Sequence, residues 1–343
     1  MIAAPLILII AIIVIALIFD FTNGFHDSAN SISTVVSTKV LSPRNAVIFA
    51  AFFNFIAAFV FGVAVASTIS KIIHLDVVAT VLVPYIILGA LIGAISWNLI
   101  TWFFGLPTSS SHALIGGLAG AGISAAGLTA IKWSTVELVV TFMILSPLIG
   151  LACGFLFMAA VLWITRKANK QSAERNFKGL QLVAAAANCF SHGTNDAQKT
   201  IGIIIPLLFA AGFYSATVDP NNLPVPFWVI ILAYTAIALG TLAGGWRIVR
   251  TMGYNIMKMR PVHGFAANAA SASTIIGASI VGIPVSTTHI ICTSIMGVGS
   301  TMGSSAVKWG VARTIMWAWI LTIPISAAIG YVAFMVIRVV IGY

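Results

Sequence analysis

Long apolar stretches alternate with short polar breaks along this chain, and the pattern predicts membrane-spanning helices. Apolar stretches of about 20 residues recur from end to end, which matches a hydrocarbon core about 30 Å thick. Open sheet edges cannot face lipid, and the period-two signal of a membrane barrel is absent. We therefore expect an all-α membrane protein with about 10–12 transmembrane or re-entrant helices.

The apolar segments form two similar series. We expect a helix from about residue 2 to 19, a disturbance at Asn23 and Gly24, and a helical continuation to about Ser37, because residues 2–38 are too long for one straight span. The other segments expected in the first half are 45–69, 81–104, the Gly- and Ala-rich 113–130, and 135–164. Those expected in the second half are 179–212, 227–246, 264–281, 290–305 and 314–341, with a Pro-rich loop at 213–226.

Two polar motifs interrupt the apolar pattern at corresponding places. They are Asn23-Gly-Phe-His-Asp-Ser-Ala-Asn30 and His192-Gly-Thr-Asn-Asp-Ala-Gln-Lys199. One constant offset relates Phe21 to Phe190, Gly24 to Gly193, Asp27 to Asp196 and Ser31 to Thr200. Asn and His exchange places, as Asn23 and His26 in the first copy and His192 and Asn195 in the second. Because an acid within membrane-type sequence is costly and rare, each aspartate is a candidate functional residue.

A second pair of motifs follows in the same order. These are Gly105-Leu-Pro-Thr-Ser-Ser-Ser-His112 and Gly282-Ile-Pro-Val-Ser-Thr-Thr-His289, and each precedes a Lys-Trp pair, Lys132-Trp133 and Lys308-Trp309. Three ordered matches favour an internal duplication, with a first repeat at 1–165, a basic connector at 166–178 and a second repeat at 179–343. The pattern leaves inversion of the repeats open, because about four or five crossings per half both fit it.

The hydroxyl-rich motifs predict helix starts that can bind an anion. Pro suits the beginning of a helix, and Ser and Thr are favoured caps. A helix N-terminus offers unpaired N–H groups and the positive end of the dipole, which suits an oxyanion such as phosphate. Simple helix capping inside the bundle is the other interpretation. The candidate phosphate ligands are Thr108, Ser109, Ser110, Ser111, Ser286, Thr287 and Thr288, together with Asn30 and Thr200.

The two aspartates require a different explanation, because Asp27 and Asp196 would repel an anion. They fit ligands of a cation that accompanies the anion, with Asn23 and Asn195 supplying neutral oxygens of the kind that sodium prefers. Proton carriage by the same carboxyl groups is the competing interpretation. A third is that the acids only hold helices together through hydrogen bonds.

Several other polar residues have roles that the sequence leaves open. His26, His192, His112 and His289 fit hydrogen-bonding partners better than zinc ligands, because no spacing such as HExxH occurs. Lys199 occupies the slot of Asn30, where it could contact the anion, snorkel or pair with an acid.

Glu137 and Arg313 occupy one slot in the two halves, five residues after Lys132 and Lys308. An ion pair between them and a cation-ligand role for Glu137 are both open. An interface position near a helix end is the favoured interpretation.

Composition supports the membrane assignment and adds an orientation. Of 343 residues, 60% are hydrophobic and 7% charged, so too few polar side chains exist to cover a soluble protein. The formal charge is +10. Basic residues in cytoplasmic loops explain most of it, which places the connector 166–178 in the cytoplasm. An anionic substrate would also suit this balance, and no nucleic acid partner is expected.

The segments Phe21-Thr-Asn-Gly-Phe-His-Asp-Ser-Ala-Asn30 and Phe190-Ser-His-Gly-Thr-Asn-Asp196 resemble the paired signatures of the PiT family of inorganic phosphate transporters. The two Pro-x-Ser-[Ser/Thr]-[Ser/Thr]-His elements agree with this resemblance. It implies a secondary transporter with inverted repeats, a central phosphate site, and sodium coupling in many members or proton or metal–phosphate transport in others. It also implies cation ligands at Asn23, Asp27 and Asp196, and phosphate ligands at 109–111 and 286–288.

Our hypothesis is therefore a multi-pass cell-membrane transporter that imports phosphate with sodium by alternating access. Sodium would bind at Asp27 and Asp196, and no other cofactor is expected. A proton-coupled carrier, a carrier of another oxyanion such as sulfate, and an anion channel are the alternatives. An intramembrane hydrolase is disfavoured because no Ser–His or metal pair has a helical spacing. Lipid is the expected partner, and a homodimer is a candidate assembly.

Overall fold

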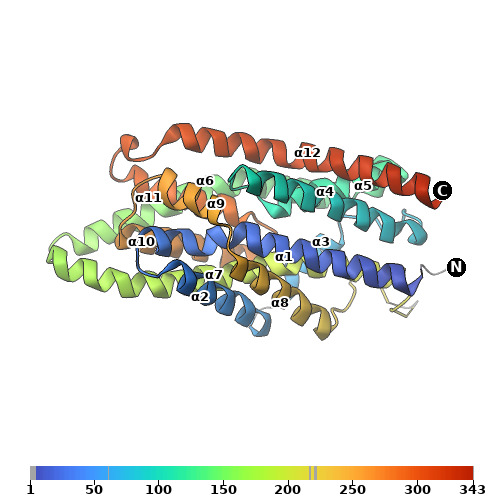
Figure 1. The fold of residues 1–343 in the computed structure, drawn as a ribbon, viewed down its shortest axis with the longest axis horizontal. Helices are drawn as coiled ribbons and strands as arrows, with labels where there is room; N and C mark the ends of the chain where they lie inside the picture. The colour runs from blue at the N-terminus through green and yellow to red at the C-terminus, as the bar shows by residue number, and fades with distance from the viewer. Residues whose placement is uncertain (1–4, 61, 216–217, 220–221, 343) are drawn as a thin grey trace.

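The protein is a bundle of helices that lie along one long axis (Figure 1). The computed structural model describes residues 5–60, 62–215, 218–219 and 222–342. Over this part the chain is almost entirely helical, as expected. The first six α-helices are α1 (Leu6–Ser37), α2 (Pro43–Ile56), α3 (Ala64–Ser70), α4 (Val83–Phe103), α5 (Ser110–Ala126) and α6 (Trp133–Thr165). The next six are α7 (Lys170–Ala210), α8 (Phe227–Ala243), α9 (Trp246–Arg250), α10 (Pro261–Ile280), α11 (Thr287–Ser300) and α12 (Trp309–Ile341).

Four helices of the described part are long and apolar enough to cross a membrane. They are α1, α4 with its preceding turn (Thr80–Phe103), α6 and α12. Two bent helix pairs meet the same test, which gives up to six spans by length and composition. The predictions of apolar spans at 81–104, 135–164 and 314–341 are confirmed.

Helix α1 is continuous, so the predicted disturbance at Asn23 and Gly24 is wrong. A Cβ atom on Gly24 would lie 2.2 Å from the carbonyl oxygen of Ile237 in α8. In α7, a Cβ atom on Gly193 would lie 2.6 Å from the carbonyl oxygen of Asn54 in α2. These glycines therefore serve close helix packing and do not break the helix. Residues 2–4 of the expected first helix lie outside the described residues.

The span expected at 45–69 is present as a bent pair of helices. The helical segments Pro43–Phe59 and Ala64–Ser70 meet at 83°. The second half contains a similar bend of 62° between Phe227–Ala243 and Trp246–Asn255, where Gly244 adopts a φ of 73° that favours glycine. Apolar composition alone carries no signal for a bend of this kind.

The basic connector at 166–178 is mostly helical. Helix α7 begins at Lys170, and the Asn169 side chain caps it by accepting from the N–H of Gln171 at 3.0 Å. The described residues of the Pro-rich loop at 213–226 are not helical, as expected. Residues 216, 217, 220 and 221 of that loop lie outside the described residues.

The two short helices that follow the hydroxyl-rich motifs, α5 and α11, each pack against a long helix of the other half. Helix α5 packs against α4 and α12, and α11 packs against α10 and α6. The Gly- and Ala-rich composition predicted to allow close packing does so, because a Cβ atom on Gly120 of α5 would lie 1.9 Å from the carbonyl oxygen of Ala327 in α12. Helices α1 and α7, which carry the acidic motifs, lie against each other and run in opposite directions (Figure 1).

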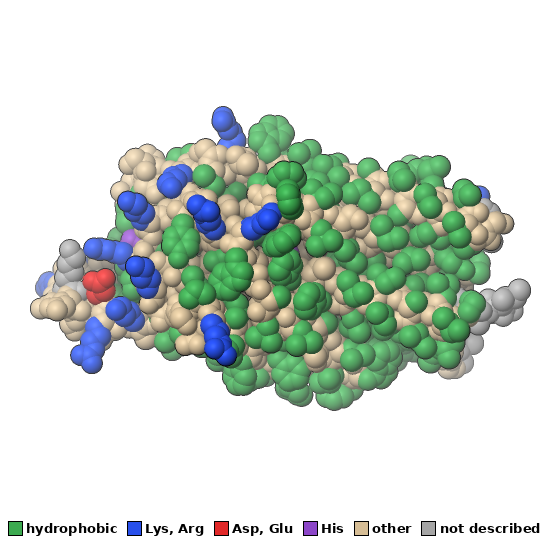
Figure 2. All heavy atoms as spheres, viewed as in Figure 1, with side chains coloured by type: hydrophobic (Ala, Val, Ile, Leu, Met, Phe, Trp, Pro, Cys, Tyr) green, Lys and Arg blue, Asp and Glu red, His purple; other side chains and the backbone are tan. Residues whose placement is uncertain are grey.

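The surface separates into a basic end and an apolar body. Lys and Arg side chains gather at the end where α6 leads into α7, and hydrophobic side chains cover most of the remainder of this face (Figure 2). Exposed hydrophobic side chains on α6 and α12 include Leu156, Trp163, Trp317 and Val336. Such a surface suits lipid.

The close approach at Gly24 yields a stability prediction. Gly24→Ala should lower the free energy of unfolding by about 1–3 kcal/mol, because the added methyl group forces α1 away from α8. The thermal midpoint of the purified protein in detergent measures this. Gly277→Ala, in α10, is the matched control, since a Cβ atom there would have no neighbouring heavy atom within 4 Å. An equal midpoint for both variants would contradict the packing role of Gly24.

Candidate functional site

The hydroxyl-rich motifs open helices, as predicted. The Ser109 side chain caps α5 by accepting from the N–H of His112 at 3.4 Å. The Ser286 side chain caps α11 by accepting from the N–H of His289 at 3.1 Å. All of the hydroxyl side chains at 108–111 and 286–288 are buried. Each turn therefore buries a helix N-terminus surrounded by hydroxyl groups.

The two helix N-termini lie together. The rings of His112 and His289, the third residues of α5 and α11, contact edge to face with 4.8 Å between centroids. Trp319 of α12 stacks on His289 at 3.9 Å and donates its Nε1–H to the Pro107 carbonyl at 2.8 Å. One tryptophan thus connects both turns, and two helix dipoles present their positive ends to one region.

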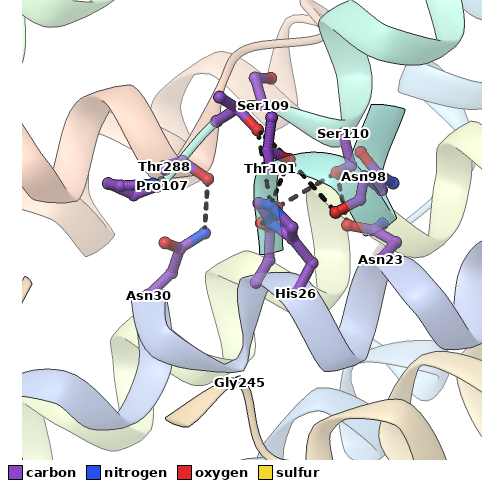
Figure 3. Close-up of polar contacts among 12 residues, drawn as sticks. Asn23, His26, Asn30, Asn98, Thr101, Pro107, Ser109, Ser110, Gly245 and Thr288 are labelled. Carbon is purple, nitrogen blue, oxygen red and sulfur yellow. Dashed lines mark hydrogen bonds and ion pairs between the residues drawn. The ribbon is translucent and has the colours of Figure 1, made fainter. Parts of the chain in front are cut away.

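The first acidic motif bonds to the first hydroxyl turn. The Ser110 hydroxyl donates to Asn23 Oδ1 at 2.5 Å and lies 3.1 Å from Asp27 Oδ2. His26 lies between two helices, with Nδ1 2.6 Å from Asp27 Oδ1 and Nε2 3.1 Å from Thr101 Oγ1 of α4. Figure 3 shows His26 and Asn23 of α1 pointing toward Thr101 and Ser110.

The second acidic motif bonds to the second hydroxyl turn. The Thr287 hydroxyl lies 3.3 Å from Asp196 Oδ2, and His192 Nε2 lies at the same distance from that oxygen. Lys199 Nζ donates to the other oxygen, Asp196 Oδ1, at 2.5 Å. Both Lys199 and Asp196 are fully buried. Asn195 points elsewhere, donating to Ser279 Oγ of α10 at 3.1 Å.

The two acidic motifs form one polar region. Asn30 of α1 donates to Thr288 Oγ1 at 2.9 Å and to Thr287 Oγ1 at 3.4 Å, so the first motif also contacts the second turn (Figure 3). Ligand atoms from Asp27, His192 and Asp196 lie within 4.8 Å of one another, which is close enough for all three to coordinate one cation. An anion at the helix N-termini would lie next to that cation.

Two predicted site residues lie apart from this centre. Glu137 is exposed in the first two turns of α6, and no ion pair joins it to Arg313 within the described ranges. Thr200 is buried on α7, where its hydroxyl has no hydrogen-bond partner and lies beside the Asp20 carboxyl group.

Asp20 is a buried acid that the motif analysis missed. It lies on α1 seven residues before Asp27, and this spacing of about two turns puts both acids on one face. Neither carboxyl oxygen of Asp20 has a hydrogen-bond partner in the described part of the chain. The charged groups that act on it are Asp196 and Lys199. The missed signal was the seven-residue spacing itself.

Comparison with known proteins identifies the family. The profile of the phosphate transporter family matches residues 23–330, a range that contains all four motifs. The chain belongs to this family.

Relatives of this phosphate transporter match it over most of its length. A probable low-affinity inorganic phosphate transporter of Rhizobium meliloti (strain 1021) is 48% identical over 322 residues, covering 94% of each chain. One of Bacillus subtilis (strain 168) is 44% identical over 342 residues, covering 98% of each chain. A solved structure titled "The sodium-dependent phosphate transporter" has a TM-score of 0.87 at 26% identity, and the match covers 97% of this chain and 100% of that one. The resemblance to the PiT family is confirmed, and the chain is an integral membrane transporter.

The buried Asp20 carboxyl group leads to a prediction in which one substitution raises the stability of the protein and lowers its transport activity. Asp20→Asn should raise the thermal midpoint, because it removes a buried carboxyl group whose oxygens accept no hydrogen bond among the described residues. The same variant should lower phosphate uptake by about tenfold or more, because an acid buried among membrane-spanning helices is a functional residue by default. Asp76→Asn, at an exposed acid, is the control and should change neither quantity. A stabilised Asp20→Asn protein with full uptake would show that this acid has no part in transport.

Proposed function

We propose that this transporter imports inorganic phosphate together with sodium by alternating access. The observation that carries the proposal is the meeting of two capped helix N-termini with the buried carboxyl groups of Asp27 and Asp196. The helix termini attract an anion and the carboxylates repel it. A cation bound at the carboxylates removes the repulsion, so phosphate binds well only when the cation is present.

In this proposal, phosphate contacts the hydroxyl and N–H groups of the two turns, at 108–111 and 286–288, with Asn30 near them. The prediction from the sequence that Thr200 is a phosphate ligand is not part of the proposal, because Thr200 lies beside Asp20. The cation contacts Asp27, Asp196 and neutral oxygens of Asn23 and Asn195. Support comes from the Asn195 Oδ1 atom, which is buried and has no hydrogen-bond partner among the described residues. Sodium as the cation is supported by the name of the similar solved structure, whereas the names of the two bacterial relatives specify no ion.

Proton coupling is the second candidate, and one contact favours it. His26 Nδ1 lies 2.6 Å from Asp27 Oδ1 in a fully buried position. An imidazole next to a carboxyl group can pass a proton, which would replace sodium as the compensating charge.

We propose further that the basic end of the molecule faces the cytoplasm of the cell and that lipid covers the apolar body. The positive-inside rule supports this orientation, because Lys and Arg side chains gather where α6 leads into α7 (Figure 2). Labelling a cysteine placed at Ala168 from each side of the membrane measures the orientation. A homodimer is a candidate assembly in that membrane.

Uptake into liposomes tests the coupling ion. An inward sodium gradient should raise the initial rate of phosphate uptake by the purified protein by about tenfold or more, since the anion site is repulsive without a cation. A pH gradient in sodium-free medium should leave the rate near its basal value. Uptake driven by the pH gradient alone would replace sodium by protons in the proposal. Inhibition by excess sulfate would instead mean a broader oxyanion carrier.

Removing a hydroxyl group tests the phosphate site. Thr288→Val keeps the side-chain shape but loses an oxygen at the N-terminus of α11. The apparent affinity for phosphate should fall about tenfold, because a hydrogen bond to a charged group contributes about 1.5–3 kcal/mol. Thr301→Val, at the other end of α11, is the matched control and should keep the affinity. Unchanged affinity in Thr288→Val would remove this turn from the phosphate site.

A further inference from the structure

Lys199 is a fully buried lysine in the centre of a membrane protein. Its Nζ atom donates to Asp196 Oδ1 at 2.5 Å, one helical turn away on α7, and neither side chain is exposed. Asp20 and Asp27 of α1 are the other negative groups on which Lys199 acts. A buried ammonium group is costly unless it is paired, so a lysine at this position requires an explanation.

The corresponding position in the first half has no positive charge. Asn30 follows Asp27 by three residues, as Lys199 follows Asp196. The Asn30 amide donates to Thr288 and Thr287 of α11 and not to Asp27. Asp27 is left with the Ser110 hydroxyl and the His26 ring as its hydrogen-bond partners, and no lysine contacts it directly among the described residues. One acidic motif therefore contains its own cation, and the other does not.

We propose that Lys199 is a built-in cation that occupies the place of one coupling cation at Asp196. This inference rests on the function proposed above and specifies its ion count. Asp196 keeps Lys199 as a positive partner whether or not the carrier is loaded, so one cation from solution, and not two, binds between Asp27 and Asp196. One coupling cation then accompanies each phosphate.

Charge balance explains the consequence of removing the lysine. Three buried carboxyl groups, those of Asp20, Asp27 and Asp196, interact with one buried ammonium group, which contacts Asp196 directly. Loss of the ammonium group leaves Asp196 with the His192 ring and the Thr287 hydroxyl as its neighbours. A buried carboxylate in that situation favours binding of a cation from solution. Lys199→Asn, which installs the residue found at position 30, should therefore create a second cation site.

The experiment measures the ratio of coupling cation to phosphate. The purified full-length protein in liposomes takes up radioactive sodium and radioactive phosphate in parallel, and the ratio of the initial rates is recorded. The wild-type ratio should be about one, and Lys199→Asn should raise it to about two. The sodium dependence of uptake should become steeper in the same variant, with an apparent order that rises by about one. Lys199→Arg keeps the charge and should keep the wild-type ratio.

Two results would overturn the inference. The first is a ratio of two coupling cations to one phosphate in the wild-type protein. This result does not depend on whether any variant folds. The second is a folded Lys199→Asn protein, with a sharp thermal transition, that keeps the wild-type ratio. Failure of the proposed function is a different result, namely phosphate uptake that a sodium gradient does not accelerate. In that case the same ratio is measured for protons in wild type, and a value of two again overturns the inference.

Discussion

Buried charge next to two helix N-termini is the constraint on which this structure depends. Helices α5 and α11 present the positive ends of their dipoles to the same buried region as Asp27 and Asp196. The dipoles attract an anion there, and the carboxyl groups oppose it. Neither set of groups alone makes a carrier, because a permanently attractive site would retain its anion and a permanently repulsive one would exclude it. In the proposed function, their combination makes anion binding conditional on a cation.

The packing of the short helices α5 and α11 connects the hydroxyl turns of each half to the other half. Helix α5 packs on α12, and α11 packs on α6, so each hydroxyl turn is held by the closing helix of the other half. Trp319 of α12 contacts both turns, through its stacking on His289 and its hydrogen bond to Pro107. In the proposed alternating-access cycle, a movement of one half against the other would move both hydroxyl turns relative to α1 and α7. These contacts would then couple binding at the centre to the rearrangement of the bundle.

The sequence predicted which polar residues lie together better than it predicted the shape of the helices that carry them. The duplicated motifs marked Asp27, Asp196 and the hydroxyl turns, because a polar group that recurs within apolar sequence is a strong signal. The continuity of α1 could not be predicted, since Gly24 weakens a helix locally and only the contact with Ile237 shows its purpose. The bend between α2 and α3 also depends on tertiary packing.

Asp20 was missed for a related reason. The corresponding position in the second half is Cys189, which is not an acid, so the comparison of the two repeats gave no signal there. The Cys189 Sγ atom lies 3.9 Å from the Ser31 carbonyl oxygen. An acid without a copy looked like an isolated polar residue, although its spacing from Asp27 placed it on the same face of α1. A residue whose role differs between the halves gives no signal when the sequences of the two repeats are compared.

The exchange of His and Asn between the two acidic motifs follows from the neighbours of each slot. In α1, Asn23 faces Ser110 and His26 reaches Thr101 of α4. In α7, His192 takes the slot of Asn23 and lies 3.4 Å from Asn54 of α2, while Asn195 takes the slot of His26 and donates to Ser279 of α10. Each ring or amide matches a partner on a different helix. The halves thus keep the same backbone plan and differ in side-chain contacts, and this asymmetry allows one aspartate to accept an external cation while the other holds an internal one.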